Sequence, residues 1–136
     1  MKWQSVLAFA ATIAFASFEA AHAAAPELPA SAKKVTWGEM AALNGGKPIP
    51  VSVEIYDLPK PITADLVWDF KKKTITGNAL VDGKDKIKVR SKLSAKGDQF
   101  CAQNGKEITC NAIYMDGQKF YEVTAAGGVH AVSTMK

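Results

Sequence analysis

The chain contains few of the residues from which enzyme active sites are built. It has two cysteines and two histidines in 136 residues. A zinc site needs three or four ligands, and paired cysteines would not be available as ligands. The sequence has no Walker motif, no G-x-G-x-x-G and no G-x-S-x-G. We therefore expect a protein that is not an enzyme, with no catalytic residue, no metal and no cofactor.

Long hydrophobic runs are also missing. The longest apolar stretch, 6–18, is too short for a good transmembrane helix and follows a positively charged start at Lys2. Ala21 and Ala23 form a small-x-small cleavage site around His22. These features predict a signal peptide over 1–23, a mature chain from Ala24 without a transmembrane segment, and a location in the periplasm or outside the cell. An uncleaved membrane anchor is the alternative.

The mature chain is short enough for one domain. Residues 24–34 are rich in proline and alanine and predict a flexible leader, and 35–136 then form a single β-rich domain. Thr36 and Glu39 form a capping box, which predicts a short helix from Trp37 to about Leu43. Asn44 and two glycines end it. We expect this helix to pack against one end of a sheet.

After the helix, apolar residues recur at every second position, as is typical of half-buried strands. The expected fold is mainly β: an antiparallel meander of about eight strands with one short N-terminal helix. The sequence does not choose between a small barrel and a sandwich. The expected strands are 51–55, 66–70, 74–81, 86–93, the two arms of a hairpin around 105–106, 119–124 and 129–134.

The only two cysteines flank that hairpin. A type II′ turn with Gly105 and Lys106 at its centre sets Cys101 opposite Cys110. The cysteines then form a non-hydrogen-bonded pair with Cα atoms about 4.5 Å apart, close enough for a disulfide. A turn at Asn104-Gly105 would instead leave the cysteines out of register. We expect the disulfide Cys101–Cys110, which by chain entropy contributes about 2.5–3 kcal/mol.

A basic strand is the first candidate binding site. The chain has a net charge of +4, which suits an acidic partner. The candidate anion-binding residues are Lys86, Lys88, Arg90 and Lys92 on one strand face, with Lys71, Lys72 and Lys73 in a nearby turn. The alternative is a solvated outer face or protection of a sheet edge. We expect no nucleic-acid partner, because no aromatic platform alternates with the basic residues.

The second candidate is a pocket lined by aromatic residues. Trp68 and Phe70 share one strand face and are the best candidates for such a pocket. The competing interpretation is that they belong to a solid core, because large aromatic residues on a sheet bury much apolar area.

Two segments carry a resemblance to known proteins. EMAALNGGKPI and QFCAQNGKEITCNAIYMDGQKFYEV resemble parts of a class of small exported bacterial domains of unknown function. The resemblance implies a short leading helix followed by a meander with a disulfide-closed hairpin.

The expected function is that of an exported binding or accessory module of the bacterial envelope. Its partner would be anionic or amphipathic, either an anionic envelope component or another envelope protein. The alternative is a structural or protein-interaction component with a solid core and no small ligand.

Overall fold

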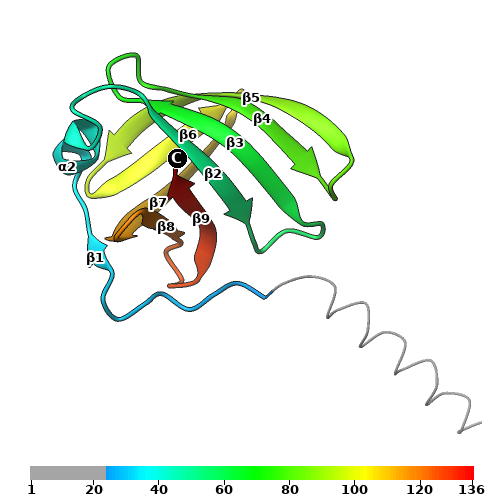
Figure 1. The fold of residues 1–136 in the computed structure, drawn as a ribbon, viewed down its shortest axis with the longest axis horizontal. Coiled ribbons are helices and arrows are strands. Elements are labelled where there is room, and N and C mark those ends of the chain that lie inside the picture. The colour runs from blue at the N-terminus through cyan, green and yellow to red at the C-terminus, as the bar shows by residue number, and fades with distance from the viewer. Residues whose placement is uncertain (1–23) are drawn as a thin grey trace, which may run out of the picture.

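The chain folds into a closed antiparallel barrel (Figure 1). The structure is a computed structural model and describes residues 24–136. The signal peptide expected over 1–23 lies outside the described residues. Within them, eight strands form the barrel, one further short strand pairs with β7, and one short helix covers an end. The expectation of a mainly β meander is confirmed, and the barrel is chosen over the sandwich.

Consecutive strands pair from β2 to β9, and β9 returns to β2 to close the barrel. Closure leaves fewer free sheet edges than an open meander would have. The elements are β1 (Lys33–Lys34), α2 (Trp37–Ala42), β2 (Ile49–Ile55), β3 (Ile62–Asp69), β4 (Thr74–Val81), β5 (Asp85–Lys96), β6 (Gln99–Asn104), β7 (Glu107–Asp116), β8 (Lys119–Val123) and β9 (Val129–Met135).

The apolar core fills the end of the barrel that α2 covers. Met40 of α2 is fully buried there. Trp37 lies beside Phe70 and Phe100, with ring centroids 4.9 and 5.8 Å apart respectively. Offset and edge-on aromatic pairs of this kind are favourable in addition to the area they bury. The helix therefore closes this end with side chains from both α2 and the strands.

The helix begins at the expected capping box. The Oγ1 of Thr36 accepts a hydrogen bond from the backbone N–H of Glu39 at 3.1 Å, and the Glu39 carboxylate accepts one from the backbone N–H of Thr36 at 2.8 Å. Two of the N–H groups that a helix start leaves unpaired are thus satisfied. A helix of six residues depends mainly on packing, and Met40 provides it.

The end of the expected leader is ordered against the barrel. Lys33 and Lys34 form β1, which pairs with Met115 and Tyr114 of β7, and Lys34 makes an ion pair with Asp98. β6 pairs with β7 only as far as Asn111, so the next part of that edge of β7 is open to β1. Sequence periodicity could not show this bridge, because it depends on where β6 ends.

The disulfide hairpin has the expected register. Cys101 lies opposite Cys110, their Cα atoms are 4.0 Å apart, and the two are disulfide-bonded. Gly105 has a φ of 65°, as the first central residue of a type II′ turn requires. The preference for the turn that starts at glycine is confirmed. The disulfide is compatible with an oxidising compartment.

Candidate functional site

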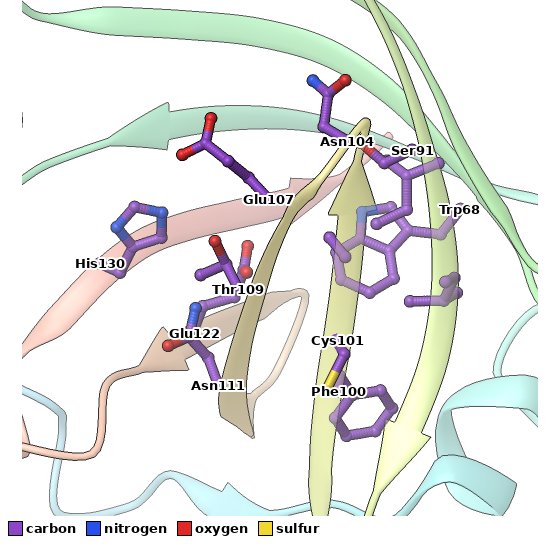
Figure 2. Close-up of a pocket in the computed structure, with 13 residues that line it drawn as sticks. Trp68, Ser91, Phe100, Cys101, Asn104, Glu107, Thr109, Asn111, Glu122 and His130 are labelled. Atoms are coloured by element: carbon purple, nitrogen blue, oxygen red, sulfur yellow. The ribbon is translucent and has the colours of Figure 1, made fainter.

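The end of the barrel opposite α2 is hollow and polar. A pocket of about 240 Å³ lies there, with Asn104 and Glu107, which flank the β6–β7 turn, among its lining residues (Figure 2). Its wall combines aromatic and aliphatic side chains with hydroxyl, amide, carboxylate and imidazole groups. The lining residues are Trp68, Ile75, Ser91, Leu93, Phe100, Cys101, Ala102, Asn104, Glu107, Thr109, Asn111, Glu122 and His130.

Strand alternation brings the polar side chains into the barrel. Glu107, Thr109 and Asn111 occupy every second position of β7, so they project on the same face. They run from the exposed rim at Glu107 to the buried amide of Asn111, which is 5% exposed. Figure 2 shows them on one side of the view, with Trp68 on the other, while Phe100 is the cross-strand neighbour of Asn111. The pocket therefore combines polar and apolar side chains.

Glu122 of β8 is the acidic group deepest in this pocket. It lies two residues after the fully buried Phe120, on the same inward face of β8. Its cross-strand neighbours are Ile113 and Ala131. Burial raises the pKa of its carboxyl, while the charge of His130 and a hydrogen bond from Asn111 oppose that rise. A carboxyl group with a raised pKa keeps its proton, and can donate a hydrogen bond, up to a higher pH than an ordinary glutamate.

Trp68 of β3 contributes a donor that has no acceptor. The side chain is 3% exposed, and its indole Nε1 has no hydrogen-bond partner among the described residues. A buried N–H without a partner costs free energy that a water molecule or a ligand acceptor would recover. The pocket next to it is large enough for either.

At the rim of the pocket, a histidine and an aspartate form a close pair. Nδ1 of His130 lies 2.7 Å from Oδ1 of Asp57, which is in the loop between β2 and β3. Asp57 has a φ of 52°, a left-handed conformation that aspartate adopts more readily than most residues. The contact joins the β2–β3 loop to β9 and holds the imidazole beside the pocket.

The two residues predicted to line a pocket lie in different places. Trp68 is part of the wall. Phe70 lies in the aromatic cluster at the α2 end, with its ring centroid 4.9 Å from that of Trp37. The two residues alternate onto the same face as expected, but Phe70 comes two residues later, just after the end of β3, and so lies nearer the closed end of the barrel.

The predicted anion-binding residues lie on the outside. β5 presents Lys86, Lys88, Arg90 and Lys92 as one exposed row on its outer face. The turn containing Lys71, Lys72 and Lys73 connects β3 to β4 near the Lys92 end of this row, because Lys92 pairs with Thr74. Among the ion pairs of residues 24–136, none involves any of these seven residues.

Sequence reasoning missed the polar half of the pocket. Glu122 shares its strand face with Phe120, so the alternation of β8 could have predicted that Glu122 points into the barrel. Ser91 likewise shares a face with Leu93. The position of Asn111 opposite Phe100 follows from the cysteine register. What was missing was the barrel closure that turns these faces toward one another.

Residues 24–136 contain no group of three or more His, Cys, Asp or Glu side chains placed to hold a metal ion. Nor do these residues form a helix of the length and apolarity needed to cross a membrane. No protein-family model matches the chain, and no curated protein or solved structure matches it either.

Proposed function

We propose that this protein is an exported, non-enzymatic binding module of the bacterial envelope that takes an amphipathic small molecule into the open end of its barrel. The observation that carries the proposal is the buried indole Nε1 of Trp68, which has no hydrogen-bond acceptor among the described residues although Trp68 lines the pocket. Burying such a donor is unfavourable unless something in the pocket accepts its hydrogen.

The lining residues define the ligand that fits. Trp68, Phe100 and Leu93 offer apolar surface, and Asn111 and Glu122 offer hydrogen bonds. Small-molecule sites commonly combine a mostly apolar lining with a few polar groups that fix orientation. The ligand would therefore have an apolar ring or chain, an acceptor for the indole N–H and a donor for the carboxyl.

The alternative is a structural component with a solid interior. The α2 end fits that description, since Met40, Ile113 and Phe120 are fully buried there. The pocket at the other end favours a binding role. The predicted anion-binding row lies outside this pocket, so an anionic partner would use a different surface.

A dye titration tests the proposal. N-phenyl-1-naphthylamine is uncharged, so the basic exterior does not attract it, and its fluorescence should rise on saturable binding to one site. Ala102→Phe should abolish that rise because the new ring fills the pocket from β6. Ala42→Phe, on the exposed face of α2 at the other end, is the matched control and should bind the dye normally.

Native mass spectrometry of protein purified gently from its own envelope fraction completes the test. A reproducible adduct that Ala102→Phe loses would support the proposal and give the mass of the ligand. Absence of saturable dye binding together with a bare protein mass would contradict it and favour the structural role.

A further inference from the structure

One strand of the barrel lacks a neighbour along much of one edge. β5 pairs with β4 from Asp85 to Lys92, but with β6 only from Lys92 to Lys96. The hairpin of β4 and β5 therefore projects beyond the β6–β7 hairpin (Figure 1). Among residues 24–136 no strand pairs with the β6 side of segment 85–91. Backbone N–H and C=O groups along such an edge can pair with an added strand.

The outer face of this segment is uniformly basic. It carries Lys86, Lys88 and Arg90, all exposed, which we call the cation row. Their cross-strand neighbours on β4 are uncharged: Leu80, Asn78 and Thr76 respectively. None of the three cations makes an ion pair within the described chain. A strand added beside them would place its own outward side chains within reach of these charges.

The inner face of the same segment is apolar and incompletely covered. Ile87 and Val89 alternate with the cation row, and Ile87 is 49% exposed although it faces inward. An inward-facing isoleucine remains exposed here because β6 does not reach this part of β5. An added strand with apolar side chains on this face would cover it.

We propose that segment 85–91 of β5 binds an extended acidic segment of a partner protein by strand addition. The partner alternates Asp or Glu, facing the cation row, with apolar residues that cover Ile87 and Val89. Main-chain hydrogen bonds supply affinity and the alternating side chains supply specificity. Of this segment only Ser91 also lines the pocket, and the inference does not depend on the proposed small ligand.

A second copy of the same chain does not fit this edge. Two β5 edges paired to each other would bring the cation row of one copy beside that of the other. Like charges directly opposite on neighbouring strands are destabilising. The charge pattern therefore disfavours self-association through this edge and favours an acidic partner.

The test uses the mature protein and a capped peptide of alternating glutamate and valine, of the same length as segment 85–91. Binding is measured by isothermal titration calorimetry. A peptide of the same composition with its glutamates and valines in two blocks should bind much more weakly. Reversing two charges with Lys88→Glu and Arg90→Glu should weaken binding at least about tenfold, since opposite-charge cross-strand pairs become like-charge pairs.

Two controls separate strand addition from general attraction. Lys71→Glu with Lys72→Glu makes the same change in net charge in the β3–β4 turn and should leave affinity nearly unchanged. Conversely, a lysine–valine peptide should bind the Lys88→Glu, Arg90→Glu protein and not the wild type.

N-methylation of the peptide tests the backbone hydrogen bonds. Methyl groups on one set of alternate residues block the pairing edge, and those on the other set face solvent. One methylated peptide should lose binding and the other should retain it. The proposal is overturned if the two methylated peptides bind equally or if the block peptide binds as tightly as the alternating one. It is also overturned if Lys71→Glu with Lys72→Glu weakens binding as much as Lys88→Glu with Arg90→Glu.

Discussion

At the scale of single residues, Glu122 is a half-buried acidic group whose pKa is raised. It lies inside the barrel between core residues and the polar wall, and burial raises the pKa of its carboxyl. The groups that face it are Asn111 on β7 and His130 on β9, and both favour the ionised form. Together they do not offset the increase in pKa that burial causes.

We predict that Glu122→Gln stabilises the protein at neutral and alkaline pH. The folded state holds the proton more tightly than the unfolded state, so wild-type stability falls as pH rises from the usual glutamate pKa of 4.5 through the raised one. Glutamine carries no charge and avoids that loss. Measured between pH 4.5 and pH 8, the melting temperature of the variant should increase relative to that of the wild type as pH rises.

The control is Glu107→Gln at the exposed rim of the same pocket. That substitution should show no such divergence with pH. A Glu122→Gln protein that is no more stable than wild type at pH 8 would contradict the conclusion that burial raises the pKa of the Glu122 carboxyl.

At the scale of elements, the pairing of β3 with β4 depends on one glycine. Gly77 lies opposite Leu66 and has a φ of +152°. A Cβ at this position would lie 2.0 Å from the backbone oxygen of Asp65. The two strands therefore approach more closely than any side chain at 77 allows.

We predict that Gly77→Ala destabilises the protein by about 3 kcal/mol, because the strands must separate or bend to admit the methyl group. Urea unfolding followed by tryptophan fluorescence measures this. Gly128→Ala is the matched control, since the nearest atom to its added Cβ is 3.9 Å away and the position has no positive φ. Equal stability of the two variants would show that β3 and β4 can adjust without cost.

At the scale of the whole molecule, the barrel has one solid end and one open end. The α2 end is packed with Met40 and the aromatic cluster, and the other end holds the polar pocket. The outside of β8 and β9 carries a second apolar cluster against which Leu28 of the N-terminal segment packs. The solid packing around α2 and the pocket of the proposed ligand thus lie toward opposite ends of one barrel.

We predict that Met40→Ala lowers the free energy of unfolding by about 3 kcal/mol, the usual cost of a cavity at a fully buried methionine. Dye binding at the open end should be preserved at a temperature where the variant is folded. Ala102→Phe should show the opposite pattern, with binding lost and stability largely retained. If Met40→Ala abolished dye binding in the folded state, the two ends would be coupled.

Much of the fold was predictable from local signals. The capping box of Thr36 and Glu39, the strand 74–81 and the turn at Gly105 all depend on residues close together in the sequence. The disulfide register followed from two local signals together, the glycine turn and the fact that only this turn sets the two cysteines opposite each other. The full length of β5 was not predictable, because its last residues pair with β6 while its first residues pair with β4.

The sequence by itself determined the β class, the short helix and the cysteine pairing, since each follows from alternation, capping or turn geometry within a few residues. Only the tertiary structure decided that the sheet closes, because closure depends on the pairing of β2 with β9, far apart in the chain. Closure also placed Trp68 across from Asn111 and Glu122, which no local pattern relates. The stagger between β5 and β6 left segment 85–91 with a free edge for the same reason: strand ends are set by partners and not by the strand's own residues.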